Sequence, residues 1–199
     1  MRIGIIILLA TLFSLYACDD LNQNDPKRQL FNNKMDLPET GSQTFGNITF
    51  KLSNLFEPYE LKSFAYNQEA LMLSIPALNL YFSVEQFKNE SLNKFIDPQL
   101  GNFSTLDNLH NTYVIYRQKS FDTFVSSIAK DLKISSPNKA IVQVIQDGNE
   151  YSEELQLYLI ATVSFNNEYY VFQFIGKKAN MGYLYDDFLA IIKSIKAKA

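Results

Sequence analysis

His110 is the only histidine of the 199-residue chain, and an acidic residue stands near it at helical spacing. Asp107 precedes it by three residues, so a helix would place a carboxylate and an imidazole on one face, as a general base and its orienting group require. No nucleophile completes the pattern, because the sequence has no Gly-x-Ser-x-Gly turn and its one cysteine lies near the N-terminus. We therefore interpret His110 as an exposed or partly packed helix residue and predict no catalytic residues and no enzyme. A hydrolase centred on His110 is the alternative.

Paired carboxylates could bind a metal, but their spacing here does not favour one. Calcium requires about six to eight oxygen ligands, often from a loop in which aspartates alternate with other residues before a glycine. Asp186-Asp187 and Glu153-Glu154 lack that spacing, and Asp147-Gly148-Asn149 is typical of a turn. We expect Asp186 and Asp187 in the first turn of a helix, where carboxylates stabilise exposed amides. The sequence predicts no metal and no cofactor.

Tyrosine is abundant, with twelve residues, whereas tryptophan is absent. Tyr169, Tyr183 and Tyr185 are close in sequence and could form an aromatic rim that binds a small ligand. Tyrosine is also a favoured strand residue, whose ring packs while its hydroxyl stays hydrated. Packing in and around the core is the favoured interpretation, and the binding rim is the alternative.

The N-terminal segment ends in the only cysteine. Arg2 precedes the apolar run Ile3–Leu15, and Tyr16-Ala17-Cys18 closes that run before Asp19-Asp20. A cationic start, a short apolar core and a small residue at the cut are typical of a secretory signal peptide. The run is shorter than the roughly 20 apolar residues that a membrane span needs.

Leu15, Ala17 and Cys18 resemble the lipobox of bacterial lipoproteins, which reads Leu-small-small-Cys, although Tyr16 is bulkier than usual at its place. The resemblance implies cleavage before Cys18, with lipid such as palmitate carried on its sulfur and new amino group. We expect a signal peptide at 1–17 and a lipid-anchored protein of the gram-negative cell envelope, with the outer membrane favoured over the inner membrane. A transmembrane anchor and a plain cleaved signal are the alternatives.

Residues 18–44 differ in composition from the remainder of the chain. Asp, Asn, Gln, Pro, Gly and Ser dominate, and the few apolar residues follow no helical or strand period. Such a segment cannot bury enough apolar surface to offset its ordering entropy, so we predict a flexible tether. Asp19-Asp20 is compatible with surface export, with retention at the inner membrane, or with an ordinary solvated linker.

Composition predicts a single globular domain over residues 45–199. The apolar fraction of 47% and the aromatic fraction of 14% suffice for a core, and one cysteine cannot form an internal disulfide. The formal net charge is −3, and lysines and arginines are interspersed with acidic residues. A basic stripe that could bind a phosphate backbone is missing, which disfavours nucleic acid as a partner.

Hydrophobic periodicity predicts strands joined by short turns and two helical regions. Strands are expected at 48–52, 71–75, 78–84, 140–146, 155–165 and 168–175, with Pro76 marking a break and Asn166-Asn167 a tight hairpin. A helical pattern runs between 85 and 131 and continues through Phe121, Phe124, Val125, Ile128 and Leu132. A last helix is expected at 183–197, packed across the two central strands. The expected buried residues are Phe172, Phe174, Leu184, Phe188 and Ile192. The pattern predicts an α+β domain with an antiparallel sheet flanked by helices.

Residues 155–197 resemble the end of PsbP-like domains, which include the photosystem subunit PsbP and small envelope lipoproteins of the DcrB kind. In that family a strand rich in Tyr and Phe runs into a helix that ends in an aromatic–Ile–Lys-Ser pattern, as in the stretch Tyr183 to Ile195. The resemblance implies an α/β/α sandwich and a non-catalytic assembly or binding module. We therefore expect a lipid-anchored module that docks a protein partner of the envelope or its secretion machinery, and a small-ligand-binding lipoprotein is the alternative.

Overall fold

The computed structural model describes residues 40–59, 70–96, 104–134, 138–147, 156–177, 181 and 184–198. The predicted signal peptide, Cys18 and Tyr183 lie outside the described residues, as does the predicted tether up to residue 39.

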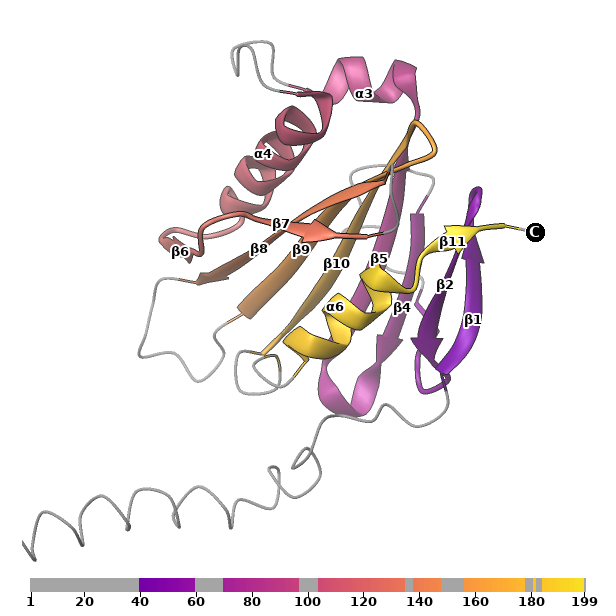
Figure 1. Cartoon of the computed structure of the whole chain (residues 1–199). Helices are drawn as coiled ribbons and strands as arrows, with labels where there is room; N and C mark the ends of the chain where they lie inside the picture. Colours follow the sequence, from indigo (N-terminus) through magenta and orange to yellow (C-terminus); the bar gives the residue numbers. More distant parts are fainter. Residues whose placement is uncertain are drawn as a thin grey trace, which may run out of the picture. The chain divides into compact units, whose positions relative to one another are not determined.

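Strands make up most of the described chain. They are β1 (Thr40–Phe45), β2 (Ile48–Ser53), β3 (Glu57–Pro58), β4 (Ala70–Ile75), β5 (Leu80–Phe87), β6 (Phe124–Ser126), β7 (Lys130–Lys133), β8 (Lys139–Asp147), β9 (Gln156–Phe165), β10 (Glu168–Lys177) and β11 (Lys196–Ala197). All described pairs are antiparallel. The larger sheet has the order β3-β4-β5-β10-β9-β8-β6, with β7 also paired to β8, and the smaller sheet has the order β1-β2-β11 (Figure 1).

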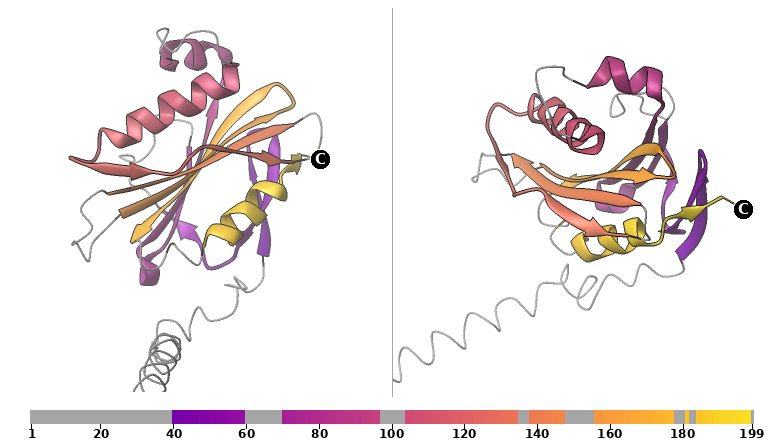
Figure 2. Two further views of the ribbon diagram at one scale, coloured as in Figure 1. Left: turned by 60° about the vertical axis from the view of Figure 1, so that its left-hand side comes forward. Right: turned by 45° about the horizontal axis from the view of Figure 1, so that its top comes forward.

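The two faces of the larger sheet are covered by different elements (Figure 2). Helices α3 (Asn89–Phe95) and α4 (Thr105–Gln118) lie on one face, and α6 (Tyr185–Lys193) lies on the other beside the smaller sheet. Phe50 of β2 packs 5.3 Å, centroid to centroid, from Phe172 of β10. The layered α+β class expected from the strand and helix pattern is confirmed.

Strands β9 and β10 lie in the middle of the larger sheet and pair as an antiparallel hairpin, as predicted. Asn166 and Asn167 join them with φ of 51° and 63°. A two-residue hairpin of type I′ needs left-handed values at both positions, and asparagine tolerates them better than most residues. Because both faces of this hairpin are covered, its strands carry apolar residues on both faces.

The core between the sheets and α6 is built from aromatic side chains. The ring of Phe188 on α6 lies 5.1 Å from that of Phe174 on β10, and Phe82 of β5 lies 5.6 Å from Phe174. The prediction of buried residues is confirmed for the whole set, which is fully buried: Phe172, Phe174, Leu184, Phe188 and Ile192.

The helical pattern predicted between 85 and 131 is wrong in its second half. Helix α4 ends at Gln118, and Phe124 and Val125 lie in β6, with Leu132 in β7. Apolar residues three and four apart also occur in a short, twisted edge strand, and these are mostly aromatic or β-branched residues that favour strands. These residues form strands because they pair with β8, which is about 20 residues from β6 in sequence but directly follows β7 in strand order.

Two predicted boundaries also differ from the structure. The last helix ends at Lys193 instead of residue 197, because Ser194 Oγ donates to Ile191 O and accepts from Lys51 N, after which the chain pairs with β2. Strand β1 begins at Thr40, so residues 40–44 belong to the folded domain and not to the predicted tether. Pro76 does mark a break, as a 3-10 turn over Pro76–Leu78 separates β4 from β5.

Candidate functional site

Exposed apolar side chains gather on the outer edge of the larger sheet. Phe124 is 45% exposed, Val125 49% and Ile128 85%, within five consecutive residues. Scattered surface apolar residues are ordinary, but a group of them next to an open strand edge is typical of an interaction site. We call residues 124–133, which comprise β6, β7 and the turn between them, the edge segment.

A β-bulge divides the edge segment. Ser126 pairs with Ile145 and Lys130 pairs with Val142, so Ser127, Ile128 and Ala129 lie opposite only two residues of β8. One extra residue on an edge strand bends the strand and changes the direction in which its side chains point. The bulge places the most exposed apolar side chain, that of Ile128, at its middle.

Ser127 ties the bulge to β8 through three hydrogen bonds. Its N–H donates to Val144 O at 2.9 Å, and its Oγ accepts from Val144 N at 3.0 Å. Its carbonyl oxygen accepts from Gln143 Nε2 at 2.8 Å. Since backbone groups alternate in direction along a strand, those of Phe124 and Ser126 face away from β8, toward the side where no described strand pairs.

His110 lies behind the bulge, which corrects the expectation of an exposed or partly packed histidine. Its side chain is 1% exposed, with Nδ1 3.0 Å from Thr162 Oγ1 and Nε2 3.0 Å from Gln143 Oε1. Because Gln143 uses its amide N–H on Ser127, its oxygen faces the ring and can only accept. The ring is therefore protonated on Nε2, and Nδ1 accepts from the Thr162 hydroxyl.

Asp107 does not orient His110. Ser104 caps α4: its hydroxyl accepts from Asp107 N and donates to the Asp107 carboxylate, so that carboxylate is bound at the start of the helix. Burial lowers the pKa of His110 below its usual 6.5, against smaller opposing effects of the Gln143 hydrogen bond and the Asp107 charge. Both ring nitrogens are hydrogen-bonded within the core, and the Thr162 hydroxyl that contacts Nδ1 is itself fully buried, so the His110–Thr162 pair does not face solvent.

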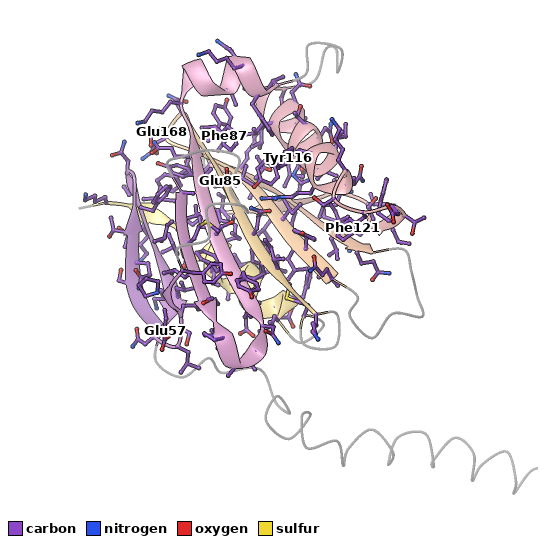
Figure 3. The ribbon with its side chains drawn as sticks, turned by 180° about the vertical axis from the view of Figure 1, so that it is seen from behind. Glu57, Glu85, Phe87, Tyr116, Phe121 and Glu168 are labelled. Carbon is purple, nitrogen blue, oxygen red and sulfur yellow. The ribbon has the colours of Figure 1, made fainter. Side chains whose placement is uncertain are left out.

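A second buried polar cluster joins α4 to the middle of the sheet. The hydroxyl of Tyr113 accepts from Arg117 Nη2 at 2.9 Å and from Gln173 Nε2 at 2.6 Å, and it donates to the Glu85 carboxylate. Figure 3 shows Glu85 on β5, beneath the helix. Burial, with the nearby Glu85 charge, raises the pKa of Tyr113 well above 10. The charges of Arg117 and Glu85 lie 3.8 Å apart, so each compensates the burial of the other.

Arg117 also packs on aromatic rings, with its guanidinium carbon 5.2 Å from the Tyr113 centroid and 5.1 Å from that of Tyr116. Sequence reasoning missed this cluster. One signal was available: Arg117 follows Tyr113 by four residues on the apolar face of α4, and Glu85 is the only charged residue of a mostly apolar strand.

The predicted aromatic rim is not assembled from its described members. Tyr169 is half-buried at the start of β10 and packs against the core beneath α4. Tyr185 is half-buried on α6, which covers the opposite face of the sheet. The two rings therefore do not share a surface, and Tyr183 lies outside the described residues.

Asp186 and Asp187 occupy the first turn of α6, as predicted. Across the ranges that the structure describes, no three His, Cys, Asp or Glu side chains are grouped as metal ligands. Among the helices in those ranges, none has the length and hydropathy of a membrane span.

Comparison with known proteins identifies the fold. No known family matches the sequence, and neither does any curated protein. The solved structure of CyanoP, the cyanobacterial PsbP of Synechocystis sp. PCC 6803, is similar with a TM-score of 0.52 and 8% identity, over 82% of this chain and 96% of that one. A mutant of the protein Mog1 is similar with a TM-score of 0.51 and 6% identity, over 80% and 96%.

A protein from Bacteroides thetaiotaomicron VPI-5482 has a TM-score of 0.49 at 11% identity, and the match covers 81% of this chain. This chain spans only half the length of that protein. The comparisons at these identities concern the fold alone. With its antiparallel sheets and few helices, the chain has the PsbP-like α+β fold that CyanoP and Mog1 share.

Proposed function

We propose that this protein is a non-catalytic, lipid-anchored module of the bacterial cell envelope, and that its edge segment docks a partner protein of the envelope or its secretion machinery. The observation that carries the docking proposal is the open strand edge with exposed Phe124, Val125 and Ile128. The lipid anchor rests on the lipobox-like residues that end at Cys18. The hydrogen bonds on both ring nitrogens and the lowered pKa of His110 support a structural and not a catalytic role for the only histidine of the chain.

The occupant that best fits the edge is an extended, acidic segment of the partner. Backbone groups of Phe124 and Ser126 face outward and can pair with an added strand, while the apolar side chains supply contact area. Lys130 and Lys133 on β7 are exposed and outnumber Asp131 between them, which favours negative charge on the incoming strand.

The docking proposal is tested by comparing two exposed isoleucines. Ile128→Asp introduces a charge into the edge segment, whereas Ile115→Asp introduces the same charge on α4, where Ile115 is 41% exposed. A partner that binds the edge is recovered by affinity capture with the wild type and with Ile115→Asp, and recovery falls at least tenfold with Ile128→Asp. Equal recovery with both variants, at equal folded protein, contradicts docking at the edge.

Charge tests the acidic nature of the partner segment. Lys130→Glu with Lys133→Glu should weaken the same complex, and should do so less at high salt, because the lost attraction is screened there. If the double variant binds as well as the wild type at low salt, the partner strand is not acidic.

The anchor is tested separately. Cys18→Ala should leave the chain unprocessed, or release it from membranes, because no other cysteine can carry lipid. Mass spectrometry of the wild type should find acyl chains on residue 18. A Cys18→Ala protein that is still processed, acylated and recovered with the envelope contradicts the lipoprotein assignment.

A further inference from the structure

The outer face of the smaller sheet is basic. Lys51 of β2 and Lys196 of β11 are exposed, and the pairing of Lys196 with Thr49 puts both side chains on the face that points away from the larger sheet. Ser42 and Thr44 of β1 lie on that same face and are exposed. The opposite face of this sheet carries Ile48, Phe50 and Leu52, which are buried against the larger sheet.

Two further lysines lie beside this face. Lys193 ends α6 next to Ser194, whose Oγ accepts the N–H of Lys51 at 2.8 Å. Lys198 follows β11, and its N–H donates to Asn47 O at 3.0 Å. None of the four lysines makes an ion pair with another residue in the described ranges. The carboxylate of Glu168 reaches this sheet but is held by Asn47 and by Tyr170. We call Lys51, Lys193, Lys196 and Lys198 the basic face.

The chain enters the domain at this same sheet. Strand β1 begins at Thr40, so the stretch from Cys18 to residue 39 joins the lipidation site to the edge of the smaller sheet. The sequence predicts a flexible tether there, and a flexible chain of that length has an average reach of about 25 Å. A surface to which Cys18 is anchored therefore lies within reach of the basic face, at a high effective concentration.

We propose that the basic face docks the domain on the anionic headgroups of the membrane that holds the lipid. The inference rests on the proposed lipid anchor and adds a defined orientation to it. Lysines near an anionic surface attract it over roughly a Debye length, about 8–10 Å, which suits side chains that extend from a sheet into solvent. Because the basic face overlies β5 and β10, the edge segment lies to its side, three strands away from β10, and stays free for a partner.

The test uses the mature chain from residue 18 with Cys18→Ser, so that binding reports the domain and not the lipid. Partition is measured by co-sedimentation with vesicles of phosphatidylcholine alone, or with about a third phosphatidylglycerol, at low and at physiological salt. One variant combines Lys51→Glu and Lys196→Glu. The matched control combines Lys94→Glu and Lys119→Glu, which change the net charge equally at exposed positions of α3 and the end of α4, across the larger sheet.

The wild type should bind the anionic vesicles, bind less as salt rises, and not bind phosphatidylcholine alone. Each basic residue near the surface contributes about fivefold, so the Lys51/Lys196 variant should lose at least about 25-fold in partition while the control loses a few-fold at most. Thermal unfolding of both variants checks that the fold is intact. Equal losses in the two variants, or no binding of the wild type to anionic vesicles at low salt, overturn the proposal.

The result of the vesicle experiment can be told apart from the tests of the lipid anchor and of docking at the edge segment. Loss of vesicle binding leaves the acylation of Cys18 and the Ile128-dependent complex to be measured as before. If the chain binds anionic vesicles through the basic face but Cys18 carries no lipid, the membrane-docking surface is supported and the lipid anchor is contradicted.

Discussion

Gln143 links the buried ring of His110 to the exposed bulge of the edge segment. Its Oε1 lies 3.0 Å from His110 Nε2, and its Nε2 donates to Ser127 O at 2.8 Å. The interior under α4 and the backbone that presents Ile128 are thus parts of one hydrogen-bond network. Loss of either hydrogen bond leaves a polar group of this network unsatisfied, so the shape of the bulge depends on the buried residues behind it.

The stability of the domain should depend on pH through His110. Its pKa is lowered in the folded protein, so the unfolded chain binds more protons below about 6.5. The stabilisation is present above the unfolded pKa and is lost as the pH falls from about 6.5 through the folded pKa. His110→Gln does not titrate, so the difference in unfolding free energy between wild type and variant should shrink as the pH falls from 7.5 to 5. Urea titrations at several pH values measure it, and a difference that stays constant contradicts the burial of a neutral ring.

Gln143→Leu should destabilise the domain by about 1–3 kcal/mol, because His110 Nε2 and Ser127 O both lose their partner. Amide exchange of Ser127 and Ile128 should accelerate as the bulge loosens. Gln146→Leu is the matched control on β8, since Gln146 is half-buried and makes no such bond. If Gln143→Leu and Gln146→Leu lower the unfolding free energy and change amide exchange equally, the hydrogen bonds of Gln143 do not hold the bulge in place.

Tyr113→Phe should cost about 1–3 kcal/mol of unfolding free energy. The substitution keeps the ring but removes the hydroxyl that bridges Arg117, Gln173 and Glu85 within the core. Tyr169→Phe, at a half-buried ring on the same face of the sheet, should change stability by no more than about 0.5 kcal/mol. Chemical denaturation of both variants checks the difference, and a Tyr113→Phe protein as stable as the wild type refutes the bridging role.

Phe188→Ala should cost roughly 3–5 kcal/mol, because its fully buried ring packs against Phe174 and a cavity would remain. Phe124→Ala removes the same group from the exposed edge and should cost less than about 1 kcal/mol. If Phe188→Ala and Phe124→Ala unfold at the same denaturant concentration, α6 is not packed on the sheet.

The elements that the sequence predicts well are those that local pattern determines. The β9–β10 hairpin is apolar on both faces and has asparagines at its turn, so its strands and its buried phenylalanines were predictable. The edge segment was not predictable, because its apolar residues fit a helical period equally well. The partners of β6 on β8 lie at least 19 residues further along the chain, so local pattern does not indicate the pairing.

The hydrogen-bond network around His110 could not be predicted from the sequence for a related reason. Thr162 and Gln143, which bury and fix His110, lie 52 and 33 residues from it, and nothing local indicates that they meet. A single histidine on an amphipathic helix is most often exposed or at the rim. Here the partners supplied by β8 and β9 compensate its burial.

The docking proposal is tested most directly by site-specific photocrosslinking in intact cells. A photoreactive amino acid replaces Ile128 in the bulge, and the same residue replaces Ile115 on α4 and Leu55, which is 48% exposed beyond β2, as controls. The proposal predicts a crosslink from position 128 to one envelope protein, absent at both controls and abolished when Lys130→Glu and Lys133→Glu are combined with it. Crosslinks from position 55 or 115 to a partner, with none from position 128, would contradict docking at the strand edge.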